Sequence, residues 1–357
     1  MERHTLCCKM SSASERQQVS ELAAALRDLN LLGGQQKYVV SPLSGGVSCD
    51  VFLFEIEGRE PLVVKRALAK LRVEADWCAP VERAETEVEW LALARKLDPR
   101  LAPPVIARDP RQHLFVMSYL PKEVFPVWKR ELAAGHVDLD FAARVGLWLA
   151  RLHGATAGIS ETSERFSNMA QFRALRLEPY LGTAAEKNPD VSAPLQALID
   201  SIARCRIALM QGDISPKNIL HGPETPVFLD AETASYGDPA FDLAFCLNHL
   251  LLKSVWHPGH TVAYGRAFDA LKHGYCSAIS WETPDALERR AAGILAGLLL
   301  ARIDGKSPVE YITHIDAKEF VRRQARRYLR ESPGTLAAIA QDWTAAIKAY
   351  FASSGSR

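Results

Sequence analysis

QGDISPKNIL, at residues 211–220, is the stretch of the sequence that says most about the fold. In this stretch Asp213 follows a glycine, Asn218 comes five residues later, and a short β-forming segment follows. An aspartate in such a loop can accept or orient the proton of an attacking hydroxyl, and an asparagine oxygen can bind Mg²⁺. The competing interpretation is a plain turn, because Asp, Ser, Pro and Asn all favour turns. We take Asp213 and Lys217 as candidate catalytic residues and Asn218 as a candidate metal ligand.

VFLDAE, at residues 227–232, extends this interpretation downstream. Asp230 comes directly after a predicted buried strand, where its carboxylate can bridge Mg²⁺ to phosphate oxygens. Glu232 is a second candidate metal ligand, through a direct or a water-mediated contact. The alternative for Asp230 is a structural role in capping the loop.

YGDPAFDLA, at residues 236–244, predicts the beginning of a helix. Asp238 suits the N-cap position and Pro239 the first helical position. Asp242 then falls on an apolar helix face, where a buried carboxylate needs hydrogen-bond donors. We expect backbone N–H groups of the Asp213 loop to supply them, so the predicted role of Asp242 is structural.

Residues 35–120 have a different pattern of residue types, in which short runs of β-forming residues alternate with turns that contain glycine or proline. We predict a small antiparallel sheet of five strands, with one helix inserted between the third strand and the fourth. The predicted strands are 38–43, 51–56, 62–67, 104–107 and 113–118, and the inserted helix is 81–97. A helix at 15–32 precedes the sheet and belongs to an N-terminal extension at residues 1–34.

The turn between the first two predicted strands is LSGGVS, at residues 43–48. Gly45 and Gly46 let a backbone approach a phosphate closely, and Ser44 and Ser48 add hydroxyl donors. We take these four residues as candidates for nucleotide binding. An ordinary hairpin turn is the alternative, since a lone Gly-Gly pair proves little.

Lys65 lies among apolar residues in the third predicted strand. Burying a lysine there is unfavourable unless it meets an anion, and an α- or β-phosphate of ATP would be such a partner. The alternative is an edge-strand lysine that points to solvent. The following helix carries Glu85, Glu87 and Glu89, any of which can pair with Lys65. Glu87 is preferred because it shares a helix stripe with apolar residues.

From about residue 138 onward the pattern is mostly helical. The predicted helices are 140–153, 193–206, 241–253, 265–280, 284–302, 317–330 and 336–352. The predicted fold class is therefore α+β, with a small lobe at 35–120 that binds nucleotide. A larger helical lobe at 121–357 would hold the catalytic loop, the metal site and the acceptor site.

The composition limits the classes of function. The 357 residues carry 43 Lys and Arg against 42 Asp and Glu, a formal net charge of +1, so we expect no nucleic-acid or membrane partner. The seven cysteines form no CxxC pair and no zinc-type cluster. We find no secretory signal and no apolar segment that could cross a bilayer, so we expect a cytoplasmic monomer or homodimer.

The order of these features resembles that of one known family. Over residues 35–255 the chain looks like the aminoglycoside phosphotransferase/choline kinase family, which has a protein-kinase-like two-lobed fold. Methylthioribose-kinase-like and uncharacterised bacterial phosphotransferases are the members it resembles most. The resemblance implies that Asp213 is the catalytic base, that Asn218 and Asp230 bind magnesium, and that Lys65 contacts ATP.

The resemblance also implies an adenine site. Met117, Ser118, Tyr119 and Leu120 would form a hinge against adenine, with the backbone of Ser118 and Leu120 making the hydrogen bonds. The chain departs from the family at Gln211 and in the tight spacing from Asn218 to Asp230, which implies a short hairpin between them. The family's usual histidine before Gly-Asp is Gln211 in this sequence. A glutamine can donate and accept hydrogen bonds as well, so we expect activity to survive.

These features imply a phosphotransferase that uses ATP and Mg²⁺ and moves the γ-phosphate to a hydroxyl of a small, sugar-like or alcohol metabolite. One alternative is an aminoglycoside-inactivating kinase, although the C-terminal part shows no excess of acidic residues for a polycation. Another is a nucleotide-binding pseudokinase or scaffold without turnover, which Gln211 keeps open. A choline acceptor would need a cluster of aromatic side chains around its quaternary ammonium, and the tryptophans of this sequence are scattered. His249 is interpreted as a satisfied structural histidine of its helix.

Overall fold

The structure is a computed structural model that describes residues 13–43, 48–70, 72 and 79–354. The chain divides into two units, Met1–Lys122 and Glu123–Arg357, next to the boundary predicted after residue 120. Ser44, Gly45 and Gly46 lie outside the described residues, so their assignment to nucleotide binding stays a prediction.

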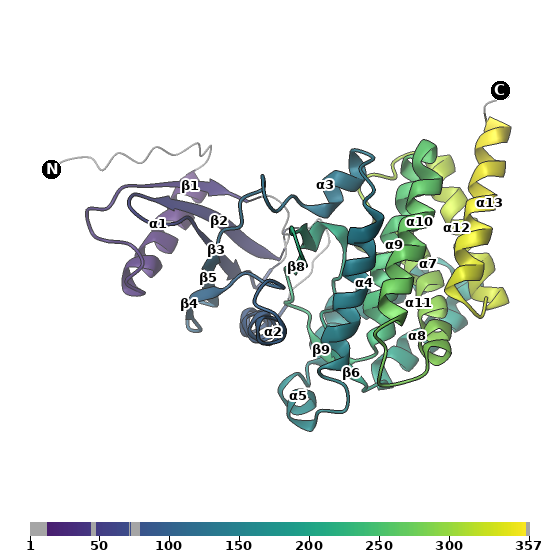
Figure 1. The fold of residues 1–357 in the computed structure, drawn as a ribbon, viewed down its shortest axis with the longest axis horizontal. Helices are drawn as coiled ribbons and strands as arrows, with labels where there is room; N and C mark the ends of the chain where they lie inside the picture. Colours follow the sequence, from purple (N-terminus) through teal and green to yellow (C-terminus); the bar gives the residue numbers. More distant parts are fainter. Residues whose placement is uncertain (1–12, 44–47, 71, 73–78, 355–357) are drawn as a thin grey trace. The chain divides into compact units, whose positions relative to one another are not determined.

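The first unit is built on an antiparallel sheet of five strands in the part that the structure describes (Figure 1). Its strand order is β1-β2-β3-β5-β4, and helix α2 comes between β3 and β4 in the chain. The strands are β1 (Tyr38–Pro42), β2 (Cys49–Ile56), β3 (Leu62–Ala67), β4 (Val105–Asp109) and β5 (Leu114–Ser118), and the helices are α1 (Ala13–Asp28) and α2 (Arg83–Leu97). The predicted five-stranded sheet with one inserted helix is confirmed.

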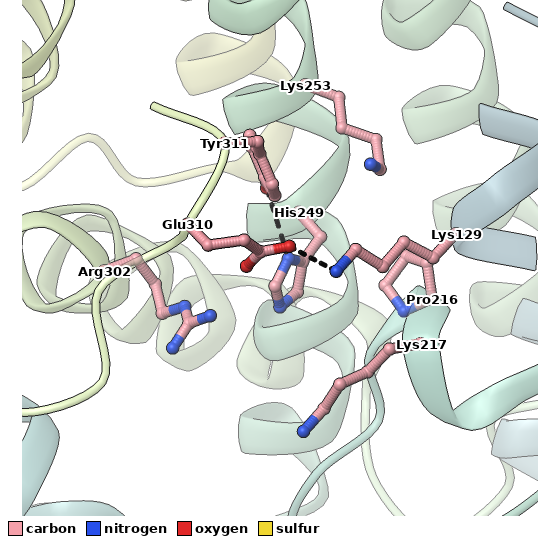
Figure 2. Close-up of a pocket in the computed structure, with 8 residues that line it drawn as sticks. All are labelled: Lys129, Pro216, Lys217, His249, Lys253, Arg302, Glu310 and Tyr311. Carbon is pink, nitrogen blue, oxygen red and sulfur yellow. Dashed lines mark hydrogen bonds and ion pairs between the residues drawn. The ribbon is translucent and has the colours of Figure 1, made fainter. Parts of the chain in front are cut away.

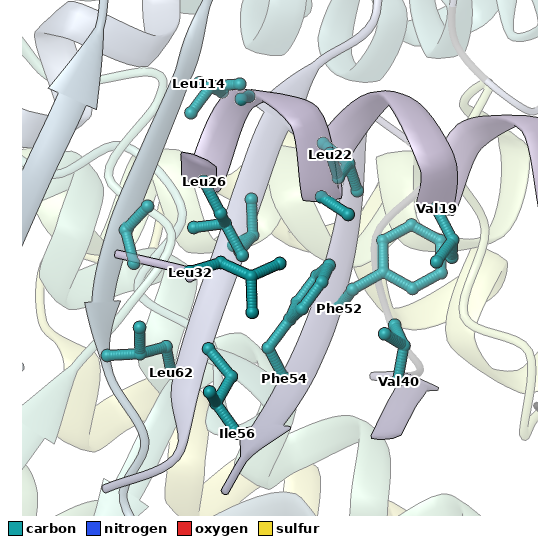
Figure 3. Packing of buried hydrophobic residues seen from close by; sticks show 14 residues of the cluster. Val19, Leu22, Leu26, Leu32, Val40, Phe52, Phe54, Ile56, Leu62 and Leu114 are labelled. Atoms are coloured by element: carbon teal, nitrogen blue, oxygen red, sulfur yellow. The ribbon is translucent and has the colours of Figure 1, made fainter. Parts of the chain in front are cut away.

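Strand β2 supplies much of the core of this unit. Phe52, Phe54 and Ile56 are buried on one face of the strand because successive side chains point to opposite faces. Helix α1 covers this face and buries Val19 and Leu22 against it, as Figure 3 shows. The apolar side chains at every second position of β2 therefore pack against the apolar face of α1, and this packing holds the sheet and the helix together.

Helix α1 ends before residue 32, where the sequence predicted its end. Asn30 has φ 59°, in the left-handed region, which stops the helix. The backbone N–H groups of Leu31 and Leu32 both donate to the carbonyl of Leu26, at 2.8 and 3.2 Å. Such a cap satisfies the last helical carbonyls. The predicted end was therefore wrong by about one turn.

The second unit is mostly helical, as predicted (Figure 1). Its longer helices are α4 (Leu139–Gly154), α8 (Ser192–Arg204), α9 (Pro239–Trp256), α10 (Thr261–Cys276), α11 (Pro284–Asp304), α12 (Ile315–Glu331) and α13 (Leu336–Ser354). Each corresponds to a predicted helix, with ends shifted by a few residues. Helix α9 is buried along almost its whole length, so the other helices surround it.

Shorter elements join these helices. The short helices are α3 (Trp128–Ala133), α5 (Ser160–Arg165), α6 (Met169–Phe172), α7 (Thr183–Lys187), the π-helix η1 (Arg173–Gly182) and the 3₁₀ helices η2 (Pro189–Val191), η3 (Pro216–Asn218) and η4 (Pro258–His260). Strand β6 (Ala208–Met210) pairs with β9 (Ser235–Gly237), and β7 (Ile219–His221) pairs with β8 (Pro226–Phe228). In the described part of the chain, every helix is too short or too polar to span a lipid bilayer.

Candidate active site

A tight turn positions Asp213 shortly after β6. Gly212 has φ 83°, in the left-handed region that glycine tolerates best. A Cβ atom at Gly212 would also lie 2.6 Å from Thr233 Oγ1 and 2.9 Å from the Thr233 carbonyl oxygen. The shape of the loop therefore requires glycine, and the absence of a side chain lets the loop pack against the segment around Thr233.

Asp213 is 3% exposed, and three polar side chains contact its carboxylate. Its Oδ2 accepts a hydrogen bond from Asn218 Nδ2 at 2.9 Å and lies 3.0 Å from Arg176 and 3.3 Å from Lys217 Nζ. The charge of Asp213 raises the pKa of Lys217 above its usual value. All three contacts fall on Oδ2, and no hydrogen bond to Oδ1 is found within the described residues. The structure thus brings Asp213, Lys217 and Asn218 together.

Arg176 belongs to this site, and the sequence interpretation missed it. It lies in η1, its side chain is buried, and its Nε donates to the Gly212 carbonyl at 2.9 Å. Burial opposes the guanidinium charge, but the nearby negative charges of Asp213, Glu232 and Asp230 raise the pKa of Arg176 above its usual value. An arginine between two leucines was the available signal, because such a residue needs an anionic partner when it is buried.

Gln211 links the Asp213 loop to the segment that follows β8. Its Nε2 donates to the carbonyls of Leu229 at 2.7 Å and Asp230 at 3.0 Å, and its Oε1 accepts from the Asp213 backbone N–H at 2.6 Å. The side chain therefore uses both its donor and its acceptor. Asp230 has φ 64°, an uncommon conformation for a residue other than glycine, and the bond from Gln211 helps to hold it.

Asp242, in the first turn of α9, holds the backbone of the same loop. Its Oδ2 accepts from the Gln211 backbone N–H at 2.7 Å, and its Oδ1 accepts from the Gly212 backbone N–H at 2.8 Å. His153 Nε2 lies 3.2 Å from Oδ2, and His153 Nδ1 lies 2.7 Å from the Tyr275 hydroxyl. The predicted structural role of Asp242, to accept from backbone donors of this loop, is confirmed.

The second unit also supplies oxygen donors of the kind that Mg²⁺ prefers. Asn218 Nδ2 donates to Oδ2 and to the carbonyl oxygen of Asp213, at 2.9 and 3.0 Å, which leaves Asn218 Oδ1 as its acceptor atom. The negative charges of Asp230 and Glu232 both raise the pKa of Arg176, so these two residues lie near the same site. Among the residues described, no group of three His, Cys, Asp or Glu side chains could hold a metal ion, and the role of Asn218, Asp230 and Glu232 as metal ligands stays a prediction.

In the first unit, Lys65 of β3 and Glu87 of α2 form a buried ion pair. Lys65 Nζ lies 2.9 Å from Glu87 Oε1 and 2.6 Å from Oε2, and the residues are 5% and 2% exposed. Glu85 pairs instead with Arg108, at 2.8 Å. The contact agrees with the preference for Glu87 as the partner, and the alternative in which Lys65 points to solvent is wrong.

The predicted adenine contacts lie at the end of β5 and just after it. The backbone N–H of Ser118 donates to the carbonyl of Pro104 at 3.1 Å. An adenine contact by the backbone of Ser118 therefore has to use its carbonyl oxygen. Met117 is a residue of β5 and Leu120 follows this strand, so these residues lie in one continuous segment, 117–120, whose binding role stays a prediction.

Arg83 donates hydrogen bonds to the backbone around Ser48, a role that the sequence did not indicate. Arg83 is fully buried, and its guanidinium donates to the carbonyls of Ser48 at 2.5 Å, Leu68 at 2.7 Å and Pro80 at 2.7 Å. It therefore ties the buried Ser48 to the end of β3 and to the beginning of α2. The role of Ser48 in nucleotide binding stays a prediction.

We expect Gln211→Leu to lower the free energy of unfolding by about 1–3 kcal/mol, because buried backbone groups lose their hydrogen-bond partners. Gln211→His keeps a donor and an acceptor and should lose less stability. Urea denaturation of both variants, followed by tryptophan fluorescence, measures the difference. A leucine variant with the same midpoint as the parent would show that these bonds do not stabilise the loop.

Comparison with known sequences identifies the family to which the chain is similar. The sequence profile described as APH, phosphotransferase enzyme family, matches residues 39–283. Methylthioribose kinase of Escherichia coli O45:K1 (strain S88 / ExPEC) is 26% identical over an alignment of 259 residues, and the match covers 64% of this chain and 60% of that protein. The chain thus spans less than two thirds of the length of this relative.

Two solved structures share the fold. Plasmodium vivax ethanolamine kinase Pv091845 has a TM-score of 0.58 at 9% identity, with 91% of this chain and 92% of that chain covered. Amicoumacin kinase hAmiN, in complex with AMP-PNP, Ca²⁺ and Ami, has a TM-score of 0.56 at 15% identity, with 92% and 99% covered. These likenesses confirm the predicted protein-kinase-like fold.

Proposed function

Because the chain belongs to the phosphotransferase enzyme family, we propose that it is a kinase that uses ATP and Mg²⁺ to phosphorylate a hydroxyl of a small, sugar-like or alcohol metabolite. The environment of Asp213 supports this proposal most. One carboxylate oxygen is held by Asn218, Arg176 and Lys217, and the other remains for an acceptor hydroxyl. A module that only binds nucleotide has no need of such a base.

In the proposed reaction, the acceptor hydroxyl donates a hydrogen bond to Asp213 Oδ1 and gives its proton to this oxygen. The acceptor oxygen attacks the γ-phosphorus and forms a new bond to it. The bond from the γ-phosphorus to the β,γ-bridging oxygen breaks, and ADP leaves with that oxygen. Lys217 and Arg176 stand beside Asp213, where their positive charges can stabilise the negative charge of the transferred group.

Asn218, Asp230 and Glu232 are the residues that we propose to hold Mg²⁺. When bound, the ion would neutralise charge on the β- and γ-phosphate oxygens. The chain contributes fixed ligand positions, because Asn218 is hydrogen-bonded to Asp213 and the Asp230 carbonyl to Gln211. Such preorganisation lowers the cost of assembling the site during the reaction.

The first unit supplies the groups that we propose to bind ATP. Lys65, held by Glu87, would contact the α- and β-phosphates as a point charge. The further proposed contacts are Ser44, Gly45, Gly46 and Ser48 for the phosphates and Met117, Ser118 and Leu120 for adenine.

We expect the double variant Lys65→Met/Glu87→Gln to bind ATP with Mg²⁺ at least about tenfold more weakly, because a charged phosphate contact is lost. Both substitutions are made together so that neither charge is left buried without its partner. Calorimetric titration with ATP measures the affinity. The matched control is Glu85→Gln/Arg108→Met, which removes a more exposed ion pair. Equal affinity of the two double variants would exclude Lys65 from nucleotide binding.

ADP release over a panel of hydroxylated metabolites tests the function as a whole. We expect turnover with at least one acceptor and none without an acceptor. Tight binding of ATP with no ADP release from any acceptor would favour the pseudokinase alternative. Release with aminoglycosides alone would favour the antibiotic-inactivating alternative.

A further inference from the structure

A pocket in the second unit lies beside the Asp213 loop, and Figure 2 shows its lining. Helices α3, α9 and α11, the 3₁₀ helix η3 and the segment after α11 contribute side chains to it. Lys217 lines the pocket and also lies 3.3 Å from Asp213 Oδ2. Lys217 therefore connects the lining of the pocket to the proposed base.

Positive charge dominates the lining of this pocket. Lys129, Lys217, Lys253 and Arg302 are basic, and Glu310 is the acidic residue that faces them. Glu310 forms an ion pair with Lys129, and Lys217 is paired with the carboxylate of Asp213. No carboxylate in the described residues forms an ion pair with Lys253 or Arg302. Arg302 Nη1 does donate to the carbonyl and hydroxyl oxygens of Ser307, so the cationic atoms without a partner among the described residues are Lys253 Nζ and Arg302 Nε.

Lys253 is the most unusual residue of the pocket. It is 1% exposed, and its Nζ has no hydrogen-bond partner among the residues that the structure describes. The ammonium lies 5.1 Å from the ring centre of Trp256 and 4.8 Å from that of Tyr311. Aromatic faces attract an ammonium, but they do not replace its hydrogen-bond acceptors. An anion in the pocket would supply them.

Two more buried nitrogen atoms in the lining lack partners. His249 Nε2 and Arg302 Nε make no hydrogen bond within the described residues, so the prediction that His249 is satisfied was wrong for this atom. Burial and the positive charges of Arg302 and Lys253 lower the pKa of His249, which keeps its ring neutral. When Nδ1 accepts from the Tyr311 hydroxyl, 3.5 Å away, Nε2 carries the hydrogen and can donate it to a ligand.

The same contacts argue against a cationic acceptor. A quaternary ammonium such as choline needs open aromatic faces. In this pocket, the Lys253 ammonium already lies over Trp256 and Tyr311. A polycation would meet Lys253 and Arg302 at the place where it needs carboxylates, so repulsion would oppose its binding.

Building on the proposed kinase function, we propose that the acceptor is a small hydroxylated oxyanion whose carboxylate or phosphate group binds Lys253, Arg302 and His249. The anionic group occupies the pocket, and a hydroxyl of the same molecule faces Asp213. Charge-assisted hydrogen bonds to the two cations give the affinity. The distance between the anionic group and the hydroxyl then selects which oxyanions are phosphorylated.

Glycerol, D-glycerate and glycerol 3-phosphate form a matched series of probes, neutral, carboxylate and phosphate. Their binding to the full chain is measured by calorimetry and by the rise in melting temperature, at constant ionic strength and without nucleotide. We expect at least one anion to bind about tenfold or more tightly than glycerol. The anion that binds better identifies the oxyanion as a carboxylate or a phosphate.

Three variants locate the binding. Lys253→Met should abolish the preference for the anion, whereas Lys306→Met, on the exposed segment after α11, should leave it unchanged. The double variant Lys65→Met/Glu87→Gln should also keep it, which separates this pocket from the proposed phosphate contacts of the first unit. Equal binding of glycerol and both anions, no binding of either anion, or a preference that survives Lys253→Met would each overturn the proposal. These titrations do not depend on turnover, so their failure is distinct from a failure of the ADP-release assay.

Discussion

Replacing Asp213 with alanine is expected to lower kcat by at least about 10²-fold, the lower range for loss of a general base. Oδ1 of Asp213 is the atom that would take the proton of the acceptor hydroxyl, and alanine removes it. Asp213→Asn is the sharper variant, because its amide keeps the shape of the side chain and cannot accept this proton. We expect both variants to lose activity to a similar degree.

Single-turnover measurement of ADP formation, with an acceptor identified by the panel, checks this result. Asp269→Asn, on the exposed face of α10, is the matched control and should keep the parent rate. ATP affinity should change little in Asp213→Asn, because the role of Asp213 is in proton transfer. A parent-like rate in Asp213→Ala would mean that another group is the base.

The sheet and the long helices could be predicted from the sequence because their patterns are local. In β2, buried residues alternate with more exposed ones, and the seven longer helices of the second unit follow a helical period. The segment that holds η1 was not predicted as a helix. It contains Pro179, and its π-helical hydrogen bonds depend on packing that no local pattern encodes.

The same difference decides which site residues could be predicted. Asp213, Asn218 and Asp230 lie within one short stretch whose residue types fit one chemistry. Arg176 reaches Asp213 from 37 positions away along the chain, so only the fold brings them together. Arg83 likewise acts through backbone carbonyls, which have no sequence signature.

Lys253 carried a signal that was not used. It follows three leucines in α9, so it interrupts a buried face of the helix. The interpretation of Lys65 rested on the same reasoning, that a lysine among apolar residues needs an anion. Lys65 has Glu87 as its partner, whereas Lys253 has no carboxylate partner in the described part of the chain. This contrast separates a cation with a resident partner from one that is left for a ligand.

Replacing Lys253 with methionine is expected to stabilise the unliganded protein by about 3 kcal/mol at pH 7. Burial is the main reason why the pKa of Lys253 falls from 10.5 to about 8; the charge of Lys129 lowers this pKa further, and that of Glu310 opposes the change. Each unit by which folding lowers the pKa corresponds to about 1.4 kcal/mol. The charged ammonium therefore destabilises the folded state, relative to the unfolded state, by this amount per unit. Methionine fills a similar volume without a charge.

The pH dependence of this gain gives the decisive measurement. Between about pH 8 and pH 10.5 the unfolded chain holds the Lys253 proton more tightly than the folded chain, so the parent gains stability as the pH rises. Urea denaturation should therefore show a large advantage of Lys253→Met at pH 7 that shrinks toward zero above pH 10.5. Lys306→Met should show no such change, because its side chain is exposed. A constant difference between Lys253→Met and the parent across this range would mean that the ammonium is not held at an energetic cost, and the argument for an anionic ligand would lose its support.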